Sequence, residues 1–434
     1  MFPEPHPLSC VNSSPAPSRP RRSGVALLIT LAVLTLIAIF LTEFSFETTL
    51  EVRALQNAQA SFQSRNAVKS LFKAVLIGLQ GGQDRKMSEV EFFYKIRRLL
   101  EFAQGVQDGT GLSLNPEEAR EVSFLNPPEL TVIPEELVQY ALPDFYESFS
   151  SVMFYTPYIR PIDHLYNLNR AQTPNRTLEK EDRVAARLNN QFINIVTRYD
   201  AENSALAEAD AMSIQARIID WIDQGDALFQ SRFPGASGNE VGFTDPNLSY
   251  PVKNGFLESL REVLLFQLPG DRMPPLEFWE ENFTTYPVGD ALGAEQDPRE
   301  VPARINVNLA LQPEIEQFLS QFDQDSTDYL SYFPSEWRDD SGAEFFQSRE
   351  RIAEALKASG TPLTRSEITS KVSGLVSTGR PDDYFIAESF WYEVRLKAGV
   401  GNVTSDVRAI VSVDRDESGL VKEDSLVVHE FHLR

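Results

Sequence analysis

The chain contains 434 residues, of which 42% are hydrophobic and 24% are charged. This length suffices for two or three domains, and the composition excludes a wholly disordered chain, a collagen-like chain and a polytopic membrane protein. The formal net charge of −23 disfavours binding to nucleic acid or to an anionic lipid surface. A single cysteine, Cys10, excludes intramolecular disulfides, and four histidines argue against a multi-histidine metal centre.

The N-terminal segment has the pattern of a membrane anchor. Residues 1–24 are rich in proline and contain Arg19, Arg21 and Arg22 close to their end. Residues 25–42 are apolar and carry no charge, so a helix over 25–46 is long enough to span a bilayer. Because the arginines precede the span, we expect the N-terminus in the cytoplasm and the rest of the chain in the periplasm, anchored in the inner membrane.

The helical pattern continues beyond the predicted span. Apolar residues recur at helical spacing as far as Leu79, and neither proline nor glycine occurs between Val25 and Ile77. The sequence therefore predicts one helix over 25–79. A cleaved secretory signal peptide is the alternative, but the apolar run is longer than usual for one and no A-x-A-like site follows it.

This leader, joined to a long helix, resembles those of type IV pilins and pseudopilins. The resemblance implies that a prepilin peptidase cleaves after Gly24 and N-methylates Val25. Most members have glutamate at the fifth mature position, where this chain has Ile29. The sequence G-V-A-L-L without that glutamate is similar to the minor pseudopilin family called type II secretion system protein K, or general secretion pathway protein K.

Downstream segments resemble the same family in the same order. They are the Asn167-Leu168-Asn169 run, ARIIDWIDQGDAL at 216–228, YPVKNGFLESLREVLLFQLPGD at 250–271 and ARINVNLALQPEIEQFLSQF at 303–322. Period-two alternation then predicts three C-terminal strands. The implied fold is α+β. A leader (1–24) and the long helix (25–79) precede a pilin-like α/β domain with an antiparallel sheet (80–199 and 371–434), which carries an inserted, mainly helical domain (200–370).

Acidic residues follow the D-W-I-D run, and the resemblance implies that this region binds calcium. Calcium takes six to eight oxygen ligands, and the candidates here are Asp223, Asp226, Glu240 and Asp245. A solvated acidic loop is the alternative reading. His429 and His432 flank Glu430-Phe431, but residues three apart on a strand point to opposite faces, so we expect no metal site there.

The sequence predicts a non-enzymatic structural subunit. The resemblance implies a minor pseudopilin that caps the pseudopilus tip and helps start its assembly, with I-type and J-type minor pseudopilins and the major pseudopilin as partners. One alternative is a minor pilin of a type IV pilus-like fibre. Another is a periplasmic enzyme held by an uncleaved signal anchor.

Overall fold

The fold is taken from a computed structural model of the chain. The structure describes residues 23–82, 86–108, 151–171, 191–201, 204–205, 208–222, 243–245, 248–250, 253–265, 273–286, 303–322, 349–358, 362–375, 384–416, 419–423 and 425–434, with scattered positions between 124 and 149. The chain divides into two compact units, residues 1–62 and 63–434, which are described separately.

The described part of the first unit belongs to helix α1, which comprises Ser23–Leu79 and has 57 residues. This confirms the single long helix that the sequence predicts. Its large apolar side chains from Leu28 to Phe62 are exposed. In the described part of the chain, α1 is the one helix long and apolar enough to cross a membrane, with a mean hydropathy of 2.2 in its most apolar window.

The second unit is built on an antiparallel sheet. Its strands are β1 (Met153–Phe154), β2 (Tyr158–Pro161), β11 (Trp391–Val400), β12 (Val403–Ser412) and β13 (Val427–Leu433), in the order β1-β11-β12-β13, with β2 also paired to β11. The sheet therefore combines one early segment with the C-terminal end of the chain. This confirms the predicted α+β fold with an antiparallel sheet and three C-terminal strands.

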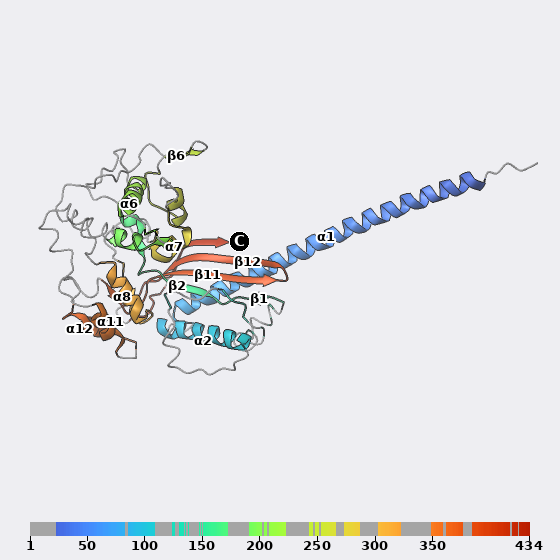
Figure 1. The fold of residues 1–434 in the computed structure, drawn as a ribbon. Coiled ribbons are helices and arrows are strands. Elements are labelled where there is room, and N and C mark those ends of the chain that lie inside the picture. Colours follow the sequence, from blue (N-terminus) through green and yellow to red (C-terminus); the bar gives the residue numbers. More distant parts are fainter. Residues whose placement is uncertain are drawn as a thin grey trace, which may run out of the picture. The chain divides into compact units, whose positions relative to one another are not determined.

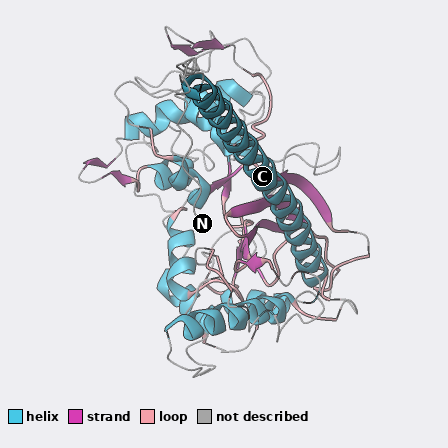
Figure 2. Ribbon diagram, turned by 90° about the vertical axis from the view of Figure 1, so that its right-hand side faces the viewer, coloured by secondary structure: helices cyan, strands magenta, loops and turns pink. Residues whose placement is uncertain are grey.

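One face of the sheet packs against two helices. Residues 63–79 of α1 bury a stripe that includes Ala67, Val68 and Leu71, and the strands supply the alternating side chains opposite them. Ser64 and Ser405 are both buried and share a hydrogen bond of 2.8 Å, which links α1 to β12. Helix α2 (Glu89–Asp108) contributes Phe92 and Phe93 to the same core. Figures 1 and 2 both show the strands running beside the C-terminal part of α1.

The described residues of the second unit outside the main sheet include helical segments and short strands. The helical elements are η2 (Leu168–Ala171), α6 (Glu208–Ile222), η3 (Leu260–Leu265), α7 (Leu276–Asn282), α8 (Gln312–Ser320), α11 (Arg349–Lys357) and α12 (Arg365–Val372). Short strand pairs accompany them: β3 (Tyr166–Asn167) with β8 (Phe283–Thr284), β9 (Ile305–Asn306) with β10 (Phe385–Ile386), β4 (Asp200–Ala201) with β5 (Ser204–Ala205), and β6 (Phe243–Asp245) with β7 (Leu248–Tyr250). A second core gathers around Tyr166, Phe192 and Trp279, all of which are fully buried. The domain boundaries at 200 and 370 stay a prediction.

Candidate functional site

Two asparagines form a clamp at the end of β3. The Nδ2 group of Asn169 donates to the carbonyl oxygens of Leu257 (3.0 Å) and Thr285 (2.7 Å), and its Oδ1 accepts from the N–H of Leu257 (2.8 Å). Asn167 supports it, because its Oδ1 accepts a 3.0 Å hydrogen bond from the Asn169 N–H. Since Asn169 is fully buried, these bonds replace the water that its amide would otherwise need. We call Asn167 and Asn169 the first clamp.

The second clamp, Asn306 and Asn308, repeats this arrangement at the end of β9. Nδ2 of Asn308 donates to the carbonyl oxygens of Leu363 (2.9 Å) and Ala387 (2.9 Å), and its Oδ1 accepts from the Leu363 N–H (2.7 Å). Asn306 Oδ1 accepts a 3.0 Å bond from the Asn308 N–H. The asparagine segments on which the sequence resemblance rests therefore act as fasteners that hold distant loops against short parallel strand pairs.

The same local plan surrounds both clamps. In each case the strand before the clamp pairs in parallel with a strand whose next residue, Thr285 or Ala387, offers its carbonyl to the clamp. In each case a glutamate then caps the turn that follows the clamped leucine. Glu262 accepts from the N–H groups of Glu258 and Ser259, and Glu367 accepts from the N–H of Thr364. Two segments of the chain thus share one local arrangement: a parallel strand pair, an asparagine clamp and a capping glutamate.

The outer face of the sheet, opposite α1, contacts the end of α7. Arg160 on β2 donates to the carbonyl oxygens of Glu280 (2.9 Å) and Glu281 (2.6 Å) in the last turn of that helix. A guanidinium at this place satisfies carbonyls that have no partner within the helix and complements the negative end of its dipole. Arg160 is only 3% exposed, so the contact belongs to the interior of the unit.

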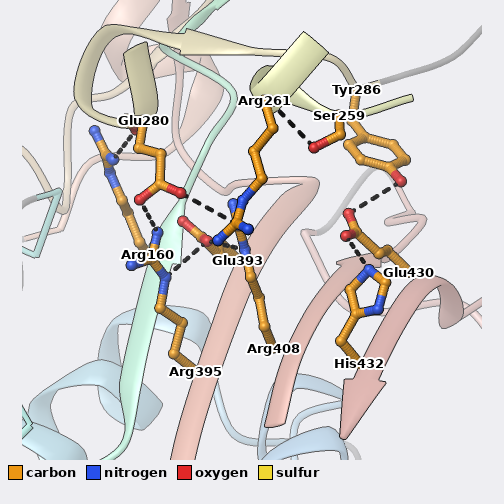
Figure 3. Close-up of polar contacts among 10 residues, drawn as sticks. All are labelled: Arg160, Ser259, Arg261, Glu280, Tyr286, Glu393, Arg395, Arg408, Glu430 and His432. Atoms are coloured by element: carbon orange, nitrogen blue, oxygen red, sulfur yellow. Dashed lines mark hydrogen bonds and ion pairs between the residues drawn. The ribbon is translucent and has the colours of Figure 1, made fainter. Parts of the chain in front are cut away.

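Two carboxylates and two further arginines complete this contact (Figure 3). Glu393 Oε1 accepts from Arg395 Nε (2.8 Å) and from Arg408 Nε (2.9 Å). Glu280 reaches the same arginines from α7, at 3.0 Å from Arg395 and 3.2 Å from Arg408. We call this set, Arg160, Glu280, Glu393, Arg395 and Arg408, the polar joint. Each arginine on β11 and β12 therefore bridges one carboxylate of the sheet and one of α7.

The electrostatics of the polar joint favour the charged forms. Burial by itself raises the pKa of Glu393, but Arg408 and Arg395 outweigh it and hold that pKa below its usual value. Burial likewise lowers the pKa of Arg395, yet Glu393 and Glu280 raise it above the ordinary range. Breaking one side of a buried pair leaves the other charge uncompensated, which typically costs about 3–5 kcal/mol. The polar joint therefore holds α7 in one position on the sheet.

The two C-terminal histidines lie on the outer face of the sheet, and the prediction that they point to opposite faces is wrong. A β-bulge between Ile410 and Val411 shifts the register of β13 by one residue, so His429 turns to the face that carries Trp391. His429 stacks on Trp391 with ring centroids 4.7 Å apart, and its Nε2 lies 2.7 Å from Ser412 Oγ. His432 pairs with Glu430 at 2.6 Å.

A third buried network joins α2 to the sheet. Glu89 Oε1 accepts from the Tyr392 hydroxyl (2.6 Å), and its Oε2 accepts from the Ser389 N–H (2.9 Å) and from Asn306 Nδ2 (3.0 Å). Arg415 donates to the Tyr392 hydroxyl at 2.8 Å and brings a positive charge close to the buried carboxylate. Glu89 thereby connects the second clamp to β11.

Comparison with solved structures gives a weak structural similarity. No known protein family matches the chain, and no curated protein matches it either. A chain of the crystal structure of the GspK-GspI-GspJ complex from the enterotoxigenic Escherichia coli type 2 secretion system is 13% identical, with 78% of this chain and 97% of that chain covered and a TM-score of 0.39.

The residues predicted for processing lie at the start of α1. Gly24 and Val25 belong to its first turn, and Ile29 follows one turn later with 60% of its surface exposed. The leader before residue 23 lies outside the described residues. Cleavage after Gly24 and methylation of Val25 stay predictions.

The predicted calcium ligands fall almost entirely outside the described residues. Asp223, Asp226 and Glu240 do so, and Asp245 ends the short strand β6. Across the described ranges, no three His, Cys, Asp or Glu side chains are grouped so that they could hold a metal ion. Calcium binding stays a prediction, which the melting temperature of the full chain with and without a chelator would test.

Sequence reasoning missed the polar joint and Glu89. The charged residues of β11 and β12 stand at alternate positions among apolar ones, which usually marks a solvated sheet face. One signal was available, because Glu393, Arg395 and Arg408 could form ion pairs on one sheet face. The position of their partner on α7 could not be read from the chain.

Proposed function

We propose that this chain is a minor pseudopilin of a type II secretion system, which caps the tip of the pseudopilus and helps start its assembly. In this role it is inserted with its N-terminus in the cytoplasm, is processed by a prepilin peptidase and places residues 63–434 in the periplasm. Its partners are the I-type and J-type minor pseudopilins and the major pseudopilin.

The continuity of α1 carries this proposal. One helix begins at the predicted cleavage site, passes through an uncharged apolar stretch and ends in the core beneath an antiparallel sheet. An anchor that only tethers an enzyme to the membrane does not need to continue as a helix into the folded unit, because a flexible linker can connect the two. Because α1 is continuous and its C-terminal part lies in the core, no linker separates the apolar stretch from the folded unit. Such coupling suits a subunit that is moved as part of a fibre.

The networks of the second unit also suit a mechanical role. The two clamps, the polar joint and Glu89 each join elements far apart in the chain. They use buried, charge-assisted or multiply bonded groups, which resist local opening better than exposed pairs. A subunit that transmits force without changing shape needs such fasteners.

The intact mass and N-terminal residue of the protein extracted from its own membranes test the proposal. We expect a mature chain that begins at N-methylated Val25. A chain that begins at Met1 would contradict the pseudopilin mechanism and favour a signal-anchored periplasmic protein. Cleavage at a different site, without methylation, would point to an ordinary secretory signal.

A further inference from the structure

Arg170 is a buried cation without an acceptor. It follows the first clamp in η2 and is only 6% exposed. Its Nε has no hydrogen-bond partner, and no hydrogen bond or ion pair joins its guanidinium to a described residue. The arginines of the polar joint, by contrast, each donate to a carbonyl or a carboxylate oxygen. A buried charge without a partner is costly, so Arg170 calls for an anion that the described residues do not supply.

The Tyr166 hydroxyl is a second buried donor at the same place. Tyr166, on β3, is fully buried, and its hydroxyl has no hydrogen-bond partner. The guanidinium carbon of Arg170 lies 5.9 Å from the centroid of the Tyr166 ring, so the two side chains are neighbours. Burial raises the pKa of Tyr166 above its ordinary value, which keeps the hydroxyl protonated and able to donate. Two adjacent donors in the interior therefore lack an acceptor.

Arg304 brings a second positive charge close to Arg170. It directly precedes β9, is half-buried, and forms no ion pair with a described residue. Its guanidinium carbon lies 6.0 Å from the centroid of the Phe390 ring. Burial, with a further contribution from the charge of Arg304, lowers the pKa of Arg170 to about 10. Two arginines from distant parts of the chain therefore repel each other where neither has a carboxylate partner.

Asp163 lies close to Arg304 but does not neutralise the pair. The N–H of Arg304 donates to the Asp163 carbonyl oxygen at 2.8 Å, which brings the two residues together. The Asp163 carboxylate nevertheless accepts from the N–H groups of Phe390 (3.1 Å) and Trp391 (3.2 Å) and forms no ion pair with a described residue. Burial raises its pKa to about 7, so it carries only part of a negative charge at neutral pH.

We propose that Arg170, Arg304 and the Tyr166 hydroxyl bind a small oxyanion of the phosphate or sulfate class. Guanidinium groups present paired N–H donors that match the oxygens of such an anion. Because Arg170 is almost completely covered, a small free ion suits the site better than an acidic side chain of another protein. The ion connects the two clamps, since Arg170 follows the first and Arg304 precedes the second. This site goes beyond the proposed function and does not depend on it.

Thermal unfolding of the full chain in detergent tests the site. The melting temperature is compared in phosphate and in chloride buffers of equal pH and ionic strength, because a ligand that binds only the folded chain stabilises it. We expect a saturable rise of about 3 °C as phosphate increases from zero to about 20 mM. Calorimetric titration of the same preparation with phosphate should also saturate. The absence of a saturable response in both measurements would overturn the proposal.

Substitution of the arginines tests which side chains bind the ion. Arg170→Gln should abolish the phosphate response. In phosphate-free buffer the same variant should melt no lower than wild type, because it removes a buried charge that then has no counter-ion. Arg304→Gln should weaken phosphate binding about tenfold. Arg98→Gln is the matched control, since Arg98 is an exposed arginine of the same unit whose guanidinium carbon lies 5.7 Å from the Tyr94 ring centroid.

The control separates specific binding from the general stabilisation that phosphate gives to folded proteins. An equal rise in melting temperature for wild type, Arg98→Gln and Arg170→Gln would identify that general effect and overturn the proposal. If Arg170→Gln does not fold, Arg304→Gln alone decides, because Arg304 is only half-buried. A rise with a poly-glutamate peptide and none with phosphate would also overturn it, because the site would then bind an acidic protein segment.

Discussion

Glu89 and Tyr392 are joined by a hydrogen bond of 2.6 Å, although 303 positions separate them in the chain. Tyr392 is fully buried on β11, and Glu89 lies in the first turn of α2. The bond fixes the first turn of α2 to strand β11 of the sheet. Residues 80–150 carry no recognisable motif, so this role is visible only in the folded chain.

Replacing Glu89 should lower the stability of the folded chain. Glu89→Gln would place an amide NH₂ group against the N–H donors that now share one carboxylate oxygen, or against the Tyr392 hydroxyl. We expect a loss of about 1–3 kcal/mol in the free energy of unfolding, because the hydrogen bonds to a charged carboxylate become weaker bonds to a neutral amide and the negative charge near Arg415 is lost. Glu91→Gln is the control, since Glu91 lies on the same helix, is half exposed and forms an ion pair with Lys95. Equal effects of the two substitutions in denaturant titrations would contradict this assignment.

Each of the two clamps should stabilise the fold independently of the other. Asn169→Ala and Asn308→Ala each leave a buried N–H and two carbonyl oxygens without their partners, and we expect each to cost about 1–3 kcal/mol. Trp221 and Trp279 are buried in the core beside the first clamp, so tryptophan fluorescence should report Asn169→Ala directly. Asn402→Ala, in the exposed turn between β11 and β12, should leave unfolding unchanged.

The polar joint should respond to the loss of one carboxylate. Glu393→Gln removes one of the two carboxylates that pair with Arg395 and Arg408, and we expect it to cost about 1–3 kcal/mol, because Glu280 still pairs with both arginines. Glu281 is the matched control, because its carbonyl accepts from Arg160 while its side chain is exposed. A Glu281→Gln variant that is as unstable as Glu393→Gln would show that α7 itself, and not the ion pairs, is sensitive to change.

Asp163 should make stability depend on pH. Its carboxylate accepts from the N–H groups of Phe390 and Trp391, but burial outweighs these bonds and raises its pKa from 3.8 to about 7. The folded chain then holds a proton between about pH 4 and pH 7 that the unfolded chain releases. The contribution of Asp163 to stability is therefore greatest below pH 4 and is lost as the pH rises through 7.

The Asp163→Asn variant tests this dependence. It should lack the part of the decline in melting temperature that wild type shows between pH 5 and pH 7.5, because an amide does not titrate. Asp406, whose backbone rather than its carboxylate bonds to Arg434, serves as a control through Asp406→Asn. Parallel pH profiles for wild type and Asp163→Asn would show that Asp163 is ionised throughout this range.

Local patterns alone determined much of this fold. The absence of proline and glycine between Val25 and Ile77, with apolar residues at helical spacing, sufficed to predict α1, since a helix depends on contacts within one segment. Period-two alternation likewise predicted β11, β12 and β13. The asparagine segments resemble a family in sequence, but their function as clamps depends on Leu257, Thr285, Leu363 and Ala387, which are distant in the chain.

Tertiary structure decided which polar residues matter. Glu393 and Glu281 are both ordinary glutamates in the sequence, yet one is buried between two arginines and the other is exposed. The bulge in β13 turned His429 toward Trp391, against the alternation of a regular strand. Whether a charge is buried and paired depends on which segments are in contact. Packing of the whole core determines those contacts. The sequence by itself therefore determined the elements and the anchor, and only packing decided the networks that join them.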